Sequence, residues 1–132
     1  MLRSGIIFLA DDDCEDVELF RDALTEICAH CNLFSFPDGY QLLEGLRNCN
    51  KLPDLIFVDV NMPTIDGFEA LVQIRQDRKL SAIPTIIYST SSNQDHISKA
   101  YALGASSYIK KPNDFKTLKE ILKKILVLHE KF

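Results

Sequence analysis

Four short apolar segments of this chain each stop abruptly at polar residues, and this pattern restricts the fold more than any other feature. The segments cover residues 6–10, 55–58, 86–88 and 108–109, and the polar residues just after them include Asp11, Asp12, Asp59, Ser89 and Lys111. Short runs rich in β-branched and aromatic residues are typical of buried strands in a parallel sheet. Because the carboxyl ends of such strands share one edge, where ligands bind, the sequence predicts that these polar side chains meet.

Strand-like and helix-like segments alternate five times along the chain. The expected strands cover residues 6–10, 32–36, 55–58, 84–89 and 107–109. The expected helices cover residues 15–28 and 40–47, begin at residue 68, run from residue 92 or 93 to Gly104, and begin again at about residue 114. Five such units without a linker predict an α/β fold. We expect a five-stranded parallel, doubly wound sheet of the flavodoxin-like order 2-1-3-4-5, with five helices.

Several of the expected helices have a recognisable apolar face. Tyr40, Leu43 and Leu46 lie on one face of the second helix, and an apolar stripe runs from Phe115 to Leu126 in the last. The lysines opposite that stripe are typical of a solvated face.

Length and composition indicate one globular domain, expected over residues 5–129 with no output domain. The 132 residues are 46% hydrophobic and 26% charged, which is ordinary for a globular protein. A net charge of −4 without a basic stripe outside the last helix disfavours nucleic-acid binding. No apolar stretch approaches the roughly 20 residues that span a membrane, and the first residues lack the features of a signal peptide. We expect a cytoplasmic protein that binds neither nucleic acid nor membrane.

The four cysteines are expected to be free thiols. Cys28 and Cys31 have the spacing of a redox or zinc motif, but they fall at the end of a helix rather than at its start. No second Cys/His pair completes a zinc site, and disulfides are rare in the cytoplasm.

Asp59 ends the third expected strand, where a carboxylate can act as the nucleophile that accepts a phosphoryl group. The simpler alternative is an Asp that only caps the next loop. The residues that follow, from Val60 through Asn61, Met62 and Pro63 to Asp66 and Gly67, predict a tight, rigid loop. Such a loop would hold the Asn61 carbonyl beside the Asp59 carboxylate.

Asp11 and Asp12 end the first strand, which neighbours the third in the expected order. Three converging carboxylates repel one another unless one is protonated or a cation lies between them. Mg²⁺ suits such a site because it takes oxygen ligands and binds through one or two carboxylates plus phosphate. Asp13 is expected only to cap the first helix.

Ser89 and Lys111 complete the predicted set. Ser89 can donate a hydrogen bond to a phosphoryl oxygen, although a Ser at a strand end is more often a helix cap. Lys111 precedes Pro112, which holds the lysine backbone extended, and its charge can offset the phosphoryl oxygens. Lys110 is the competing candidate, but strand alternation sends it to the other face.

Together these residues resemble the receiver domains of two-component response regulators, over nearly the whole chain. The resemblance rests on the acidic pair after the first strand, Asp59 in the segment 58–63, Asp66-Gly67, Ser89, the segment 104–108 and Lys111-Pro112. Thr90, where the family usually has a smaller residue, and Asn113, where many members have Phe, depart from the pattern.

The resemblance implies that a sensor histidine kinase or a histidine phosphotransfer protein phosphorylates Asp59. It implies Mg²⁺ held by Asp12, Asp59 and the Asn61 carbonyl, with Asp11 acting through water. Ser89 and Tyr108 look like the family's switch pair. If the chain is the full protein, we expect it to signal by docking to another protein through the fourth and fifth strand-to-helix regions. If it is part of a longer hybrid kinase or regulator, the output lies elsewhere.

Two other classes of protein are weaker alternatives. A haloacid dehalogenase-like phosphatase also forms an aspartyl phosphate at a strand end. It needs a second Asp two residues later to protonate the leaving group, and this chain has Asn61 there. A flavodoxin-like nucleotide binder needs a Gly- or Ser/Thr-rich loop after the first strand, where the three aspartates would repel phosphate.

Overall fold

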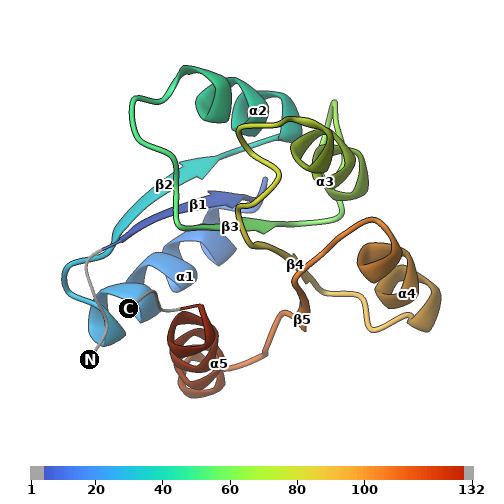
Figure 1. Cartoon of the computed structure of the whole chain (residues 1–132). Coiled ribbons are helices and arrows are strands. Elements are labelled where there is room, and N and C mark those ends of the chain that lie inside the picture. Colours follow the sequence, from blue (N-terminus) through green and yellow to red (C-terminus); the bar gives the residue numbers. More distant parts are fainter. Residues whose placement is uncertain (1–4, 130–132) are drawn as a thin grey trace.

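The computed structural model describes residues 5–129 as one parallel sheet covered by helices on both faces (Figure 1). Strands and helices alternate as β1 (Ile6–Ala10), α1 (Cys14–Ile27), β2 (Asn32–Phe36), α2 (Gly39–Asn48), β3 (Leu55–Val58), α3 (Gly67–Gln76), β4 (Thr85–Ser89), α4 (Gln94–Ala102), β5 (Ser107–Lys110) and α5 (Phe115–Leu128). The strand order is β2-β1-β3-β4-β5 and all neighbours are parallel. The predicted fold class and strand order are confirmed.

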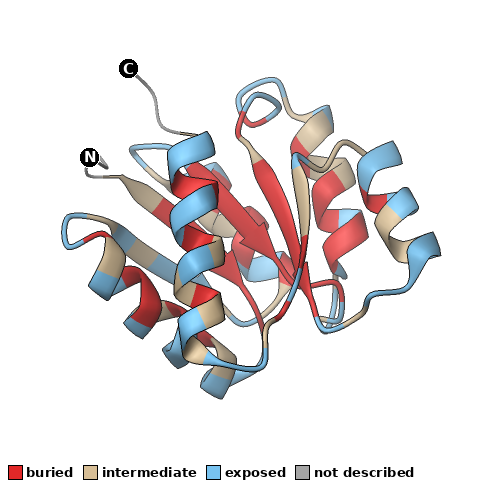
Figure 2. Cartoon of the chain, turned by 90° about the horizontal axis from the view of Figure 1, so that it is seen from below, coloured by how far each residue is buried: buried red, intermediate tan, exposed pale blue. Residues whose placement is uncertain are grey.

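The strands alternate their side chains between two apolar clusters. Leu9 and Phe57 face the cluster that α1 and α5 cover, whereas Phe8 and Ile56 face the one that α2, α3 and α4 cover. Figure 2 shows the resulting buried centre between exposed outer helix faces. Burial on both faces explains why the central strands read as continuous apolar runs.

Polar caps fix where the helices begin. An Asp or Asn side chain accepts backbone N–H groups at the start of every helix among residues 5–129; these caps are Asp13, Asp38, Asp66, Asn93 and Asp114. Side-chain oxygens at this position satisfy N–H groups that have no partner within the helix. Asp13 therefore caps the first helix as expected.

The expected faces of α2 and the end of α4 need small corrections. Tyr40 is 55% exposed, and Leu42 takes the inward position beside Leu43 and Leu46. Helix α4 ends at Ala102 with Leu103 as its C-cap, and Gly104 follows with a φ of 105°. This left-handed conformation favours glycine. Gly104 therefore ends the helix from the position that follows the C-cap residue.

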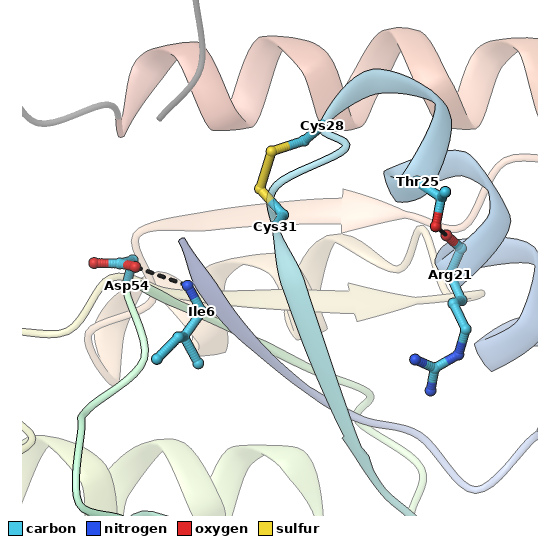
Figure 3. The surroundings of a disulfide bond; sticks show 6 residues. All are labelled: Ile6, Arg21, Thr25, Cys28, Cys31 and Asp54. Carbon is cyan, nitrogen blue, oxygen red and sulfur yellow. Dashed lines mark hydrogen bonds between the residues drawn. A yellow bond between two sulfur atoms is a disulfide. The ribbon is translucent and has the colours of Figure 1, made fainter. Parts of the chain in front are cut away.

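The expectation of four free thiols is wrong, because Cys28 and Cys31 form a disulfide (Figure 3). Cys28 is the C-cap of α1 and Cys31 immediately precedes β2, so the chain reverses between them and brings their Cα atoms to 5.4 Å. This separation is within the range that a disulfide requires. Cys14 and Cys49 are free.

Across residues 5–129, none of the helices combines the length and the apolar composition needed to cross a membrane.

Candidate functional site

The register of the sheet brings the predicted polar residues to one edge. Ala10 pairs with Val58, and Ser89 pairs with Lys110, so the strands end nearly level. The backbone N–H of Asp59 donates to the Ala10 carbonyl at 2.9 Å, and that of Lys111 donates to the Ser89 carbonyl at 2.7 Å. These bonds extend the ladder by one residue and fix the side chains that follow it.

The ammonium group of Lys111 lies among three carboxylates. Its Nζ is 2.8 Å from Asp11 Oδ2, 2.8 Å from Asp16 Oδ2 and 3.0 Å from Asp59 Oδ2. Lys111, Asp11 and Asp59 are all buried, whereas the competing Lys110 is exposed. The structure thus brings Lys111, and not Lys110, to the carboxylates.

The three contacts of Lys111 differ in kind. Its Nζ donates hydrogen bonds to Asp16 and Asp59. The Asp11 contact is as short, but its geometry is not that of a hydrogen bond, and Asp11 Oδ2 has no hydrogen-bond partner within residues 5–129. Asp11 Oδ2 is thus paired with the lysine by charge but accepts no hydrogen bond in the described residues, which leaves it free to bind a cation.

Asp11, Asp12 and Asp59 form a cluster that fits a divalent cation. Each offers one carboxylate oxygen, and these oxygens all lie within 4.8 Å of one another. Asp12 is exposed while the other two are buried, so the cluster opens to solvent on one side. All-oxygen donor sets with room for water are typical of Mg²⁺ and related hard cations. The structure therefore contains an acidic divalent-cation site at the edge of the sheet.

The electrostatics of this cluster follow from burial. Burial raises the pKa of Asp11 to about 6, against the opposing attraction of Lys111. Burial by itself would lower the pKa of Lys111, but its close contacts with the carboxylates of Asp11, Asp16 and Asp59 raise it instead. The lysine is therefore a permanent cation, while Asp11 is a carboxylate whose charge is poorly compensated.

The loop after Asp59 is held tightly against the site. The backbone N–H of Asn61 donates to Asp59 Oδ1 at 3.3 Å, while the rest of Asn61 is exposed. Gly67 at the start of α3 packs so closely on the Asp59 carbonyl that a Cβ there would clash with it. The loop needs glycine for this close approach.

Ser89 is fully buried at the end of β4 and is linked to the following loop. Its Oγ accepts a hydrogen bond from the Ser91 backbone N–H at 3.1 Å. The Ser91 carbonyl in turn accepts one from the Tyr108 hydroxyl at 2.8 Å. Ser89 and Tyr108 are thus joined through Ser91, whereas Thr90 is exposed.

Asp16 is a site residue that the sequence analysis did not identify. It is the third residue of α1, and it reaches Lys111 although the two are 95 positions apart in the sequence. An acidic residue in the first turn of a helix is explained equally well by the helix dipole. The available signal was positional, because the helix that starts at this edge of the sheet presents its first turn to the site.

A parallel, doubly wound sheet with a lysine and a cation-binding group of aspartates at its carboxyl edge defines a phosphoacceptor signalling module rather than a catalytic enzyme. The family described as "Response regulator receiver domain" matches residues 7–123, and the chain belongs to this family. The phosphatase alternative is thereby excluded.

Several relatives resemble the chain over most of their length. It is 31% identical to the "Probable methanogenesis regulatory protein FilR2" of Methanothrix harundinacea, over 91% of this chain and 80% of that protein. It is 30% identical to "Response regulator Rcp1" of Synechocystis, over 86% and 80%. The crystal structure of the phosphorylated cyanobacterial phytochrome response regulator RcpA superposes with a TM-score of 0.86 at 34% identity, covering 93% of this chain and 91% of that one.

Proposed function

We propose that this receiver domain, taken as residues 5–129, accepts a phosphoryl group on Asp59 from a sensor histidine kinase or a histidine phosphotransfer protein. The observation that carries the proposal is the Asp59 carboxylate, which is buried within the cation cluster, contacts Lys111 and accepts a hydrogen bond from the Asn61 N–H. A buried carboxylate held by a lysine and placed beside a cation site is arranged for attack on an electrophile such as phosphorus.

In the proposed transfer, an Asp59 carboxylate oxygen attacks the phosphorus atom of a phosphohistidine. The P–N bond breaks, its electron pair stays on the imidazole nitrogen, and that nitrogen takes up a proton from solvent. The Lys111 ammonium, 3.0 Å from Asp59 Oδ2, is placed to offset charge on the phosphoryl oxygens. Ser89 is proposed to donate a hydrogen bond to one of these oxygens.

We assign the cation as Mg²⁺, held by Asp11, Asp12, Asp59 and the Asn61 carbonyl. The oxygen-only donor set supports this choice, as does Asp11 Oδ2, which accepts no hydrogen bond in the described part of the chain. A solved structure of Rcp1, 28% identical with a TM-score of 0.82, is described as its Mn(2+)-bound form. When bound, Mg²⁺ neutralises charge on the phosphoryl group and the carboxylates around it.

The readout is proposed to be a change of the protein-docking surface. A phosphoryl group adds nearly two negative charges at the edge of the sheet. If Ser89 turns toward that charge, its bond to Ser91 breaks, and Ser91 also holds the Tyr108 hydroxyl. The charge thereby shifts the equilibrium between two packings of the β4–α4 loop and β5. We propose that the downstream protein partner binds at this surface.

Intact-mass spectrometry tests the proposal directly. Acetyl phosphate or phosphoramidate with Mg²⁺ should add one phosphoryl group to the wild type and none to Asp59→Asn. Asp22→Asn, which neutralises an exposed carboxylate of α1, is the matched control and should be labelled like the wild type. Equal labelling of Asp59→Asn would overturn the assignment of the acceptor.

A further inference from the structure

We propose that Asp16 is a positioning residue, which keeps the Lys111 ammonium paired when a divalent cation occupies Asp11, Asp12 and Asp59. This inference rests on the proposed function, because it concerns the same cation site. Asp16 lies outside the cation cluster but has one of the shortest contacts to Lys111, with 2.8 Å between Asp16 Oδ2 and Lys111 Nζ.

A bound cation and the Lys111 ammonium would interact with the same two buried carboxylates. Lys111 Nζ contacts Asp11 Oδ2 and Asp59 Oδ2, and both residues also supply oxygens to the cation cluster. A bound divalent cation would withdraw negative charge from these oxygens and would repel the ammonium at short range. Without another partner, Lys111 would weaken cation binding or would lose its place beside Asp59.

Asp16 supplies the missing partner. Its side chain is 30% exposed whereas that of Lys111 is 7% exposed, so Asp16 lies at the solvent side of the lysine. The backbone that carries this carboxylate is fixed at the start of α1, because the Asp13 cap accepts a hydrogen bond from the backbone N–H of Asp16 at 3.2 Å. A charge-assisted hydrogen bond from Lys111 to this carboxylate is stronger than a neutral one. The lysine can therefore share two carboxylates with the cation while it keeps a third for itself.

Stabilisation of the helix dipole is the competing explanation for the position of Asp16. A comparison with Glu15 distinguishes this explanation from a role in pairing Lys111. Both residues are acidic and lie in the first turn of α1, but only Asp16 contacts Lys111 in the described part of the chain. Glu15 is exposed. Glu15→Gln therefore measures the effect of removing one negative charge from this turn without touching the lysine.

The test is a double-mutant cycle read out as the Mg²⁺ dissociation constant by titration calorimetry. Asp16→Asn should weaken Mg²⁺ binding about fivefold in the wild-type background, within the range of coupling between residues in contact. In the Lys111→Met background the same substitution should weaken binding no more than Glu15→Gln does. Asp16→Glu, which restores a carboxylate, should recover part of the loss.

A second readout follows the lysine itself. In the Mg²⁺-loaded wild type, the Lys111 side-chain NH₃⁺ resonance should stay observable by ¹⁵N NMR because the group is buried and hydrogen-bonded. Asp16→Asn should lose it through faster exchange with water, whereas Glu15→Gln should keep it.

The outcomes separate this inference from the proposed function. An equal loss of Mg²⁺ affinity from Asp16→Asn in both backgrounds would overturn the role of Asp16 alone. An absence of Mg²⁺ binding in the wild type would reject the cation site itself, and with it both proposals.

Discussion

Asp11 Oδ2 lies 2.8 Å from Lys111 Nζ, and yet it accepts no hydrogen bond from any group within residues 5–129. The lysine directs its hydrogen bonds to Asp16 and Asp59 instead. Asp11 is consequently a buried carboxylate with incomplete compensation, and burial raises its pKa to about 6. The carboxylates of Asp11, Asp12 and Asp59 lie close enough to repel one another, and a bound cation would relieve that repulsion.

The first prediction is that the metal-free domain loses stability as the pH rises from about 4 to 7, through Asp11. Because the pKa of Asp11 rises from 3.8 to about 6 on folding, the folded state holds this proton over a range where the unfolded chain has released it. Stability falls with pH wherever the folded state binds more protons. Asp11→Asn removes this contribution, so its unfolding free energy relative to the wild type should grow by roughly 3 kcal/mol between about pH 4 and pH 7.

Urea denaturation in the presence of a chelator measures this difference. Parallel pH profiles for Asp11→Asn and the wild type would contradict the predicted shift. Adding Mg²⁺ to the wild type near pH 7 should reverse the loss, because the cation favours the ionised carboxylate.

The second prediction concerns the exposed member of the cation cluster. Mg²⁺ should raise the melting temperature of the wild type, because a ligand that binds only the folded state stabilises it. At ten times its dissociation constant, the cation should add about 1.4 kcal/mol to the free energy of unfolding. Asp12→Ala should abolish this increment, and relief of repulsion should leave the metal-free protein as stable or more stable. Differential scanning calorimetry with and without Mg²⁺ measures both effects.

Asp13→Ala is the matched control for Asp12→Ala. It removes the adjacent carboxylate, which caps α1 and lies outside the cation cluster. It should lower stability by about 1 kcal/mol through the lost cap but keep the Mg²⁺ increment. An Asp12→Ala protein that still responds fully to Mg²⁺ would remove Asp12 from the set of ligands.

The strands and the site edge were accessible to sequence reasoning because both depend on short-range patterns. Apolar runs such as residues 55–58 are buried on both faces of the sheet. A polar residue directly after such a run, for example Asp59, therefore lies at the edge of the sheet. Capping residues such as Asp13 are equally local, because their side chains bond N–H groups two and three positions later.

The features that the sequence did not reveal depend on contacts between distant segments or on the direction in which a side chain or the chain itself turns. The Asp16 contact to Lys111 requires the position of α1 over the sheet, which periodicity does not supply. Tyr40 fits the apolar period of α2, but its side chain is 55% exposed, because the buried face of the helix is centred on Leu42, Leu43 and Leu46. The cysteine expectation failed because it argued from the cellular compartment and ignored how sharply the chain turns between α1 and β2.

The third prediction is that the disulfide stabilises the fold modestly and does not influence phosphorylation. It closes a short loop, with a sequence separation of 3, so the loop-entropy argument gives about 2 kcal/mol at most. Cys31 precedes the start of β2, whereas the phosphoacceptor site follows the ends of β1 and β3 at the opposite edge of the sheet. Cys28→Ser with Cys31→Ser should therefore lower the unfolding free energy and leave acetyl phosphate labelling unchanged.

Chemical denaturation and intact-mass spectrometry test the two halves of this prediction. Reduction of the wild type by dithiothreitol should reproduce the stability of the double variant. A labelling rate that changes on reduction would show that the disulfide communicates with the site.

The fourth prediction separates phosphorylation from the conformational switch at Ser89. Ser89→Ala retains Asp59, Lys111 and the cation cluster, so it should still accept one phosphoryl group. It lacks the hydroxyl that would leave Ser91 for the phosphoryl oxygens, so the loop that holds Tyr108 should stay in its resting packing. Hydrogen exchange with beryllofluoride and Mg²⁺ should show protection changes around Tyr108 and α4 in the wild type and much smaller ones in Ser89→Ala.

Ser92→Ala and Thr90→Ala complete this test. Ser92 is an exposed hydroxyl of the same loop, and its removal should leave the wild-type response intact. A full wild-type change in Ser89→Ala would reject the coupling through Ser91. If Thr90→Ala then abolished the change, the donor would be Thr90, whose exposed side chain would have to turn inward from the position it has here.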